Sequence, residues 1–180
     1  MHLKKKLRTG YTTGTCAAAA AKGALLWLLG RRPEHVTLQL PAGLEAVLPV
    51  CAISQDDASA ACEVIKDGGD DPDVTNGAAI QAQVSLRSDE RIAIHGGAGV
   101  GLVTRPGLAV APGEPAINPV PRMMIKTALQ EILPSGTGAD VTISVSRGKE
   151  LAKKTLNPRL GITGGISILG STGIVIPYSH

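Results

Sequence analysis

The chain has 180 residues, of which 43% are hydrophobic, so it can form one compact domain and is too apolar to be disordered. Aromatic residues make up only 2%, which leaves almost no stacking platforms for single-stranded nucleic acid. The formal net charge of +3 suits an anionic small substrate, but it is too weak to indicate binding to nucleic acid.

Hydrophobic periodicity predicts helices and strands that interleave along the chain. In chain order they are a helix at residues 16–29, strands at 36–40, 44–50, 60–64, 80–86 and 91–95, a helix at 123–133, a strand at 141–145 and a short helix at 149–155. We expect residues 88–90 to turn the chain, so that the strands on either side of them form a hairpin. Two glycine-punctuated apolar runs between residues 161 and 176 also suit strands.

The first helix is apolar on nearly every face, so we expect it to be buried, with Thr13 or Thr15 as its cap. It is too short to span a membrane, which takes roughly 20 apolar residues. Because the elements show no regular βαβ period, we expect an α+β (mixed α/β) fold. A mixed sheet with helices packed on it and Gly-rich connecting loops would form a single domain at residues 1–180.

The three cysteines, Cys16, Cys51 and Cys62, show no CxxC spacing, and an odd number cannot pair completely. Neither a zinc site nor a disulfide framework is therefore indicated, and a reducing cytoplasm is the expected location. No protein metal site is predicted.

The segment at residues 12–15 runs straight into the first helix. Its backbone N–H groups and hydroxyls would then lie at the positive end of the helix dipole, where an anion can bind. A plain helix cap is the alternative interpretation. Cys16, the next residue, is either a thiol of lowered pKa or a small core residue.

A second segment, residues 66–77, places four aspartates within seven positions directly after a strand. Their mutual repulsion calls for a nearby cation or donor, and the candidates are Lys66, a bound metal or the N–H groups of a tight turn. Three interpretations stay open for this segment: a turn, a role in substrate binding or acid–base chemistry, and a metal site. The spacing does not match the Ca²⁺ loop pattern.

A third segment, residues 96–101, is glycine-rich and follows a strand, as a nucleotide-binding loop does. It lacks the helix that a Rossmann fingerprint opens and the Lys-Ser/Thr pair of a P-loop. Its glycines serve either close approach to a ligand or turn geometry. The loop, together with the aspartates, also leaves a phosphotransferase open as an alternative function.

Five segments together resemble the successive signatures of the cobalt-precorrin-5B (C1)-methyltransferase family. They read LRTGYTTGTCAAAAAKGAL, VIKDGGDDPDVTNGA, GGAGVGLVTRPGLAV, PAINPVPRMMI and NPRLGITGGISILGSTGIVIP, and they cover almost all of the chain. One small departure is Gly68, where the family more often has alanine. A larger one is length: members are about twice as long, so the chain is similar to their N-terminal portion, and the second half of the family's usual length is absent.

The resemblance implies S-adenosylmethionine as methyl donor and co-substrate, and methylation of C1 of cobalt-precorrin-5B to give cobalt-precorrin-6A in cobalamin biosynthesis. Cobalt would arrive only as part of the tetrapyrrole substrate. No nucleic-acid or membrane partner is expected, and a homo-oligomer is left open. A non-catalytic fragment that binds a corrinoid precursor is the alternative.

For this chemistry we assign hypothetical roles to residues of the quoted segments. The catalytic candidates are Asp67 and Asp70, which could take up a proton or steady positive charge. The donor-binding candidates are Thr12, Thr13, Gly14, Thr15, Gly97, Gly99 and Gly101. The substrate-binding candidates are Arg8, Arg105, Asn118, Arg122 and Arg159, because guanidinium groups hold the carboxylates of a tetrapyrrole in register.

Overall fold

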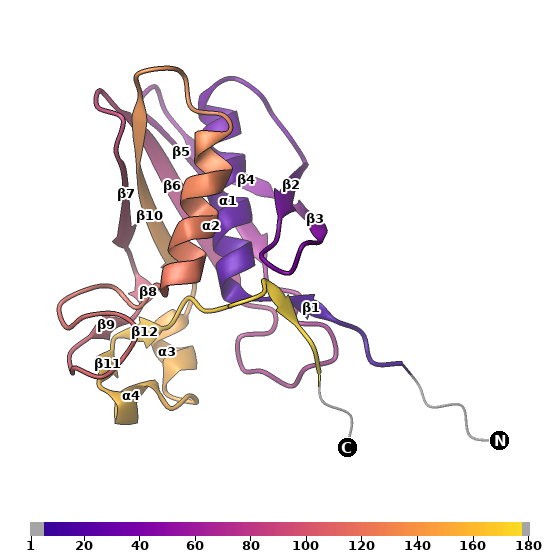
Figure 1. The fold of residues 1–180 in the computed structure, drawn as a ribbon, viewed down its shortest axis with the longest axis vertical. Helices are drawn as coiled ribbons and strands as arrows, with labels where there is room; N and C mark the ends of the chain where they lie inside the picture. Colours follow the sequence, from indigo (N-terminus) through magenta and orange to yellow (C-terminus); the bar gives the residue numbers. More distant parts are fainter. Residues whose placement is uncertain (1–5, 178–180) are drawn as a thin grey trace.

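The computed structural model describes residues 6–177, in which a five-stranded sheet carries two long helices (Figure 1). The strand order is β4-β5-β6-β10-β7. These strands are β4 (Cys51–Gln55), β5 (Ser59–Ile65), β6 (Ala79–Arg87), β10 (Gly138–Val145) and β7 (Ile92–Gly96). All neighbours are antiparallel except β10 and β7, which run parallel. The predicted α+β fold with a mixed sheet is therefore confirmed.

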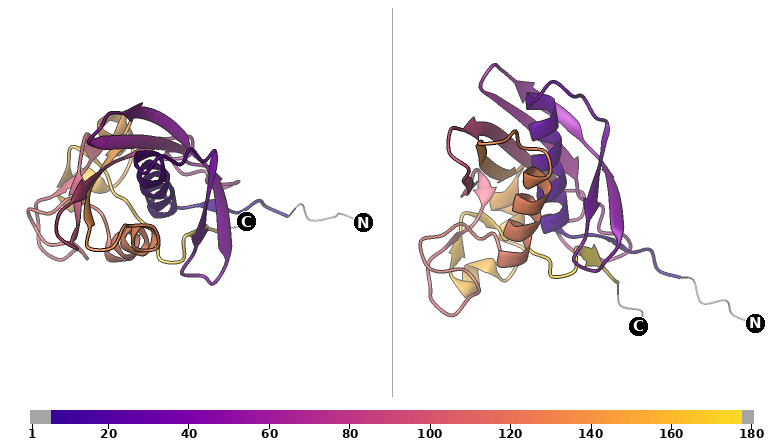
Figure 2. Two further views of the ribbon diagram at one scale, coloured as in Figure 1. Left: turned by 90° about the horizontal axis from the view of Figure 1, so that it is seen from above. Right: turned by 45° about the horizontal axis from the view of Figure 1, so that its top comes forward.

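Helix α1 (Thr13–Leu28) is the buried centre of the domain. Every residue from 16 to 21 is fully buried, and five of these six are alanine, whose small side chain lets the helix lie close to its neighbours. Figure 2 shows it end-on in its left view, between the sheet, the second long helix and a separate hairpin. The helix begins earlier than predicted because Thr12, rather than Thr13 or Thr15, is the N-cap: its Oγ1 accepts from Thr15 N at 3.2 Å.

The separate hairpin consists of β2 (His35–Gln39) and β3 (Glu45–Pro49), as the sequence predicted. One face of it is buried toward α1 through Val36, Leu38 and Leu48, while Val47 on the other face is half exposed. The alternation of buried and exposed residues therefore matches the period of two that defines a half-buried strand.

Helix α2 (Pro119–Gln130) begins four residues before its predicted start and packs beside α1 (Figure 1). Pro119 is its first residue. Proline suits this position because an N–H group there has no acceptor within the helix, and because the ring fixes φ near the helical value. The predicted helix at residues 149–155 is the shorter α3 (Gly148–Ala152), and α4 (Asn157–Leu160) was not predicted.

The predicted hairpin between residues 80–86 and 91–95 is wrong, because β10 lies between β6 and β7. Val141 of β10 is opposite Val84 of β6 on one side and Ile94 of β7 on the other. β10 takes the inner position because its alternate residues Ala139, Val141 and Ile143 are apolar and fully buried. β7 is only partly buried and lies at the edge of the sheet. The other edge, β4, has a largely exposed pattern and gave no signal in the sequence.

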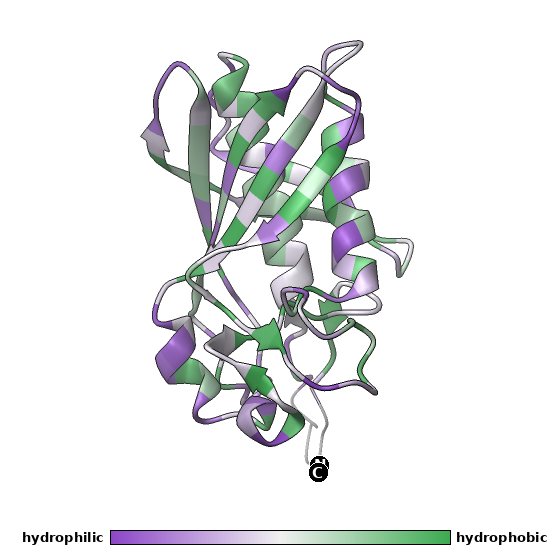
Figure 3. Cartoon of the chain, turned by 90° about the vertical axis from the view of Figure 1, so that its left-hand side faces the viewer, coloured by the Kyte–Doolittle hydropathy of each residue, from purple (hydrophilic) through white to green (hydrophobic). Residues whose placement is uncertain are grey.

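Short strands tie the glycine-rich segments together below the sheet (Figure 1). They form three pairs: β1 (Gly10–Tyr11) with β13 (Ile174–Val175), β8 (Gly99–Val100) with β12 (Gly165–Ile166), and β9 (Leu102–Val103) with β11 (Ile162–Thr163). The two apolar runs predicted in the tail thus contain three strands, β11, β12 and β13, each only two residues long. Figure 3 shows the bands of alternating hydropathy along the longer strands above them.

Within residues 6–177, no helix is long and apolar enough to cross a membrane. The same residues contain no group of three or more His, Cys, Asp or Glu side chains placed to hold a metal ion.

Candidate functional site

A pocket of about 410 Å³ lies at the N-terminal end of α1. Three parts of the chain meet there: the start of α1, the loop after β5, and the segment from α4 to β13. Its polar lining is Thr12, Thr13, Lys66, Asp73, Thr75, Thr155, Asn157 and Ser167, and its apolar lining is Leu156, Leu160, Ile166, Leu169 and Val175. The pocket has the size and the mostly apolar walls of a small-molecule site.

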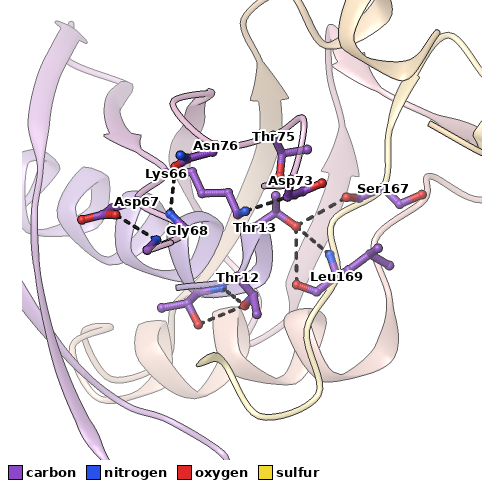
Figure 4. Close-up of polar contacts among 12 residues, drawn as sticks. Thr12, Thr13, Lys66, Asp67, Gly68, Asp73, Thr75, Asn76, Ser167 and Leu169 are labelled. Atoms are coloured by element: carbon purple, nitrogen blue, oxygen red, sulfur yellow. Dashed lines mark hydrogen bonds and ion pairs between the residues drawn. The ribbon is translucent and has the colours of Figure 1, made fainter. Parts of the chain in front are cut away.

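The charged group of the pocket is the pair of Lys66 and Asp73 (Figure 4). The Lys66 side chain is only 2% exposed, and its Nζ lies 3.2 Å from Asp73 Oδ2. The hydroxyl of Thr75 donates to the same oxygen. Burial raises the pKa of Asp73, but the Thr75 hydroxyl and the Lys66 charge outweigh it, so the pKa lies below its ordinary value. Asp73 therefore stays ionised beside a buried ammonium.

Residues 12–15, which we call the threonine segment, mainly hold the C-terminal part of the chain in place. Thr13 Oγ1 accepts from Leu169 N at 2.9 Å, Gly14 N donates to Leu169 O at 2.8 Å, and Thr15 Oγ1 donates to Gly173 O at 2.8 Å. Of the four predicted donor-binding residues in this segment, Thr12 and Thr13 line the pocket. Gly14 and Thr15 are fully or nearly buried and are not part of its lining.

Two further pocket residues, Asn157 and Ser167, are hydrogen-bonded to each other. Asn157 Nδ2 donates to Gly165 O at 3.1 Å and to Ser167 Oγ at 3.2 Å, and both side chains are at least nine-tenths buried. These bonds hold the short helix α4 against β12, and Leu160 of α4 and its N-cap residue Leu156 line the pocket.

Cys16, behind the threonine segment, is a core residue. It is fully buried, and burial raises the pKa of its thiol to about 12. Of the two interpretations of Cys16, the structure supports the small core residue. Cys16, Cys51 and Cys62 are all free thiols.

The two predicted catalytic carboxylates lie beside Arg8, outside the lining of the 410 Å³ pocket. Arg8 Nη1 donates to Asp67 Oδ2 at 2.8 Å, and Arg8 N donates to Asp70 Oδ2 at 2.6 Å. The hydrogen bond from Arg8 lowers the pKa of Asp67. Asp67 and Arg8 line a separate pocket of about 270 Å³ next to Tyr11. The structure thus brings three predicted site residues together, and their contacts also fasten the N-terminal segment to the loop after β5.

Two side-chain cations balance the aspartate-rich segment at residues 66–77. Lys66 pairs with Asp73 and Arg8 pairs with Asp67, and both aspartates belong to the four that the sequence singled out. Lys66 was among the three candidates considered for balancing this charge.

Residues 96–101, the glycine segment, pack against the protein itself. A Cβ at Gly97 would meet Ser144 and Thr142, one at Gly99 would overlap the carbonyl of Val145, and one at Gly101 would overlap Ile162. Gly99 also has a positive φ of 81°. The close backbone approach that glycine permits is thus used for strand packing. The glycine segment was the main argument for a phosphotransferase, and this packing against the protein gives that alternative no support.

Besides Arg8, the predicted substrate-binding arginines fall into two places. Arg105 Nη1 donates to Arg159 O at 3.2 Å, so these two residues are neighbours at the exposed surface near α4. Arg122 instead donates from Nε to Ile117 O at 2.6 Å and lines an open concavity of about 640 Å³ with Lys126. 

Asn118 is the N-cap of α2 without a side-chain cap bond, and its N donates to Ile168 O at 3.0 Å.

Sequence reasoning missed most of the pocket. Lys66, Asp73, Thr75, Asn157 and Ser167 were not among the proposed site residues. The available signal was a lysine at the end of a buried strand, followed by aspartates and a threonine, because a lysine in that position is buried only when a carboxylate pairs with it.

The chain matches the profile of the CbiD family over residues 1–177. It is 53% identical over 177 residues to the cobalt-precorrin-5B C(1)-methyltransferase of Alkaliphilus metalliredigens, covering 98% of this chain and 47% of the relative. It is 55% identical over 176 residues to the protein of the same name from Thermus thermophilus, again covering 98% and 47%.

A solved structure is also similar. The crystal structure of the cobalamin biosynthesis protein CbiD from Archaeoglobus fulgidus superposes with a TM-score of 0.73 at 36% identity, over 96% of this chain and 56% of that one. The chain spans about half the length of the curated relatives that it matches.

Proposed function

This chain belongs to the CbiD family, and we propose that it takes part in the S-adenosylmethionine-dependent methylation of C1 of cobalt-precorrin-5B to cobalt-precorrin-6A, in the biosynthesis of cobalamin. Two relatives more than 50% identical to it carry the name of that activity. The chain spans about half of their length, so the activity of the whole protein is part of this proposal.

The observation that carries the proposal is the 410 Å³ pocket at the start of α1. Pockets of roughly 300–1,000 Å³ hold ligands of drug size, which suits the methyl donor, whereas a tetrapyrrole with its side chains is too large to be enclosed there. We therefore assign the pocket to the donor, and the exposed surface around it to the acceptor.

The reaction requires little acid–base catalysis by the protein. In an in-line displacement, an electron pair of the macrocycle forms the new bond from C1 to the methyl carbon, and the pair of the broken carbon–sulfur bond stays on sulfur as S-adenosylhomocysteine forms. The donor is already activated, so the protein chiefly aligns the two carbons and excludes water. Leu156, Leu160 and Leu169 on the pocket wall would help to exclude water.

Roles for charged residues remain part of the proposal. Asp67 and Asp70 are candidates to take up a proton from the acceptor, and Arg8 holds both of them. Arg105, Arg122, Arg159 and Asn118 are candidates for contacts to its acetate and propionate groups. Cobalt belongs to the substrate. The reaction would take place in the cytoplasm on a small-molecule partner without nucleic acid or membrane, and a homo-oligomer stays open.

Calorimetric and thermal-shift titration with S-adenosylhomocysteine tests the proposal. We expect the 180-residue chain to bind, and its melting temperature to rise with ligand concentration, because a ligand that binds only the folded state stabilises it. The full-length Thermus thermophilus relative is the positive control. Binding by the relative without binding by this chain would contradict the assignment of the donor to this pocket. A tetrapyrrole that binds while the donor does not would favour the corrinoid-binding fragment.

A further inference from the structure

The buried pair in the pocket presents two opposite charges side by side. Lys66 Nζ and Asp73 Oδ2 are 3.2 Å apart, the lysine side chain is 2% exposed and the aspartate side chain is 40% exposed. A lysine buried to this degree is rare, because removing an ammonium from water is costly unless a partner compensates it. Asp73 compensates it, yet both residues line the pocket instead of lying under a closed core.

A ligand that suits this pair has to offer both charges. A lone carboxylate facing Lys66 would also face the ionised Asp73, and a lone ammonium would face Lys66. An α-amino acid group carries a carboxylate and an ammonium two bonds apart, so each of its charges can meet the opposite one. Charge-assisted hydrogen bonds of this kind are the strong class in proteins.

The start of α1 favours one orientation of such a group. Thr12 and Thr13 bring the N-terminal end of a 16-residue helix to the pocket, and that end carries partial positive charge. Lys66 lines the same pocket as these two residues. A carboxylate is therefore stabilised at the Lys66 side, and the ammonium at the more exposed Asp73.

We infer that Lys66 and Asp73 bind the zwitterionic amino-acid end of the methyl donor, Lys66 its carboxylate and Asp73 its ammonium. The inference rests on the proposed function and adds which end of the donor the pocket recognises. The apolar wall of Leu156, Leu160 and Leu169 then receives the less polar part of the molecule. Of these, Leu156 is 65% and Leu169 48% exposed, so apolar surface is open to a ligand.

Two probes separate the ends of the donor. S-adenosylhomocysteine contains the amino-acid group, and 5′-methylthioadenosine has the same nucleoside thioether without it. Binding of each by calorimetry would be measured for the 180-residue chain and for Lys66→Met and Asp73→Asn. Methionine has a similar length to lysine, and the Asp73 side chain that Lys66→Met leaves behind is 40% exposed and can be hydrated, so this variant is expected to fold. Asp73→Asn leaves the buried Lys66 with an amide oxygen in place of its carboxylate, so we expect it to be less stable. Melting curves by circular dichroism show that each variant is folded at the temperature of the titration.

The matched control is Lys22→Met. Lys22 of α1 also pairs with a carboxylate, that of Glu131 at 3.5 Å, and it donates to Thr37 O of β2 at 2.6 Å. It is not part of the pocket lining. Its loss should leave the affinity for both probes unchanged.

In the unmodified chain we expect S-adenosylhomocysteine to bind about 10- to 100-fold more tightly than 5′-methylthioadenosine, the range of one or two charge-assisted contacts. In each pocket variant that preference should fall severalfold or disappear, with the affinity for 5′-methylthioadenosine retained. Unchanged affinity of both variants for S-adenosylhomocysteine would overturn the inference and leave the proposed function standing. So would an equal loss for both probes, which indicates a purely structural pair. If the unmodified chain binds neither probe, the donor assignment in the proposed function fails, and the inference fails with it.

Discussion

The threonine segment and the glycine segment look alike in the sequence but differ in what surrounds them. Both are short stretches of small residues next to a regular element, and both were predicted to contact the donor through their backbone. In the structure, Thr12 and Thr13 face a pocket, whereas Gly97, Gly99 and Gly101 face backbone and side chains of the protein. A glycine-rich loop therefore indicates that something approaches closely, and the approaching group can be the protein itself.

The largest effect on stability is expected for Gly99→Ala, in the glycine segment. The substitution combines a φ of 81° with overlap on the Val145 carbonyl, so we expect the free energy of unfolding to fall by about 3 kcal/mol or more. Urea denaturation measures it. Gly136→Ala is the control, because Gly136 has a φ of 78° and nothing within 4 Å of its Cβ position. It should lose only about 1 kcal/mol. Equal losses would mean that the glycine segment is not closely packed.

Within the threonine segment, Gly14→Ala tests whether that glycine serves packing or a ligand. Its Cβ would lie 2.7 Å from Pro121 Cγ and 2.8 Å from Leu169 O, so overpacking should lower stability by about 1–2 kcal/mol, despite the better helix propensity of alanine. In the same helix, Gly23→Ala would meet only Val50 side-chain atoms at 3.2–3.3 Å. Its denaturation midpoint should move little. A stabilised Gly14→Ala would show that α1 and α2 are loosely packed there.

Thr13→Val removes a hydroxyl without changing the shape of the side chain. Leu169 N then loses its acceptor, and we expect a loss of about 1–2 kcal/mol in chemical denaturation. Thr172→Val removes a comparable acceptor from Ile174 N at an exposed site, where water replaces it. If the two variants lose the same amount, the contact between the threonine segment and the C-terminal segment is not the buried anchor that we describe.

The smallest effect on stability is expected for substitution of the exposed Asp89, whose charge pair with Arg87 lies outside the pockets described above. The hydrogen bond from Arg87 holds the pKa of Asp89 at about 2, below its ordinary value of 3.8. Because the folded-state pKa is lowered, the ionised group stabilises the fold above about pH 4, and that contribution is lost as the pH falls toward 2.

For Asp89→Asn, the difference in denaturation midpoint from the unmodified chain should be small above pH 4 and should shrink toward zero near pH 2. Glu90→Gln, at the next exposed position, should follow the unmodified chain more closely. A midpoint difference that grows on acidification would contradict the sign of this shift.

Much of the fold was predictable from the sequence, because its signals are local. The period of two in β2, β3, β5, β6 and β10, and the apolar run of α1, placed these elements within a few residues of their true bounds. The errors at the helix starts also have local causes, namely the cap at Thr12 and the proline at residue 119.

The candidate site was predictable only in part. The threonine segment and the aspartate-rich segment were recognised as unusual, and the structure places both beside the pocket. Nothing in the sequence said that Asp73 rather than Asp67 would meet Lys66, or that Arg8 would hold Asp67 and Asp70. These pairings join residues that the chain brings together only by folding back on itself.

The sequence by itself thus determined most of the longer helices and strands, the burial of α1 and the family resemblance, since all three depend on residue type and spacing along the chain. Tertiary structure decided that β10 enters between β6 and β7, that the glycine segment packs on Val145 and Ile162, and that a buried ammonium lines a pocket. The physical reason is that strand pairing, close packing and burial of charge depend on contacts between residues far apart in the chain. Such contacts leave no periodic pattern in the sequence.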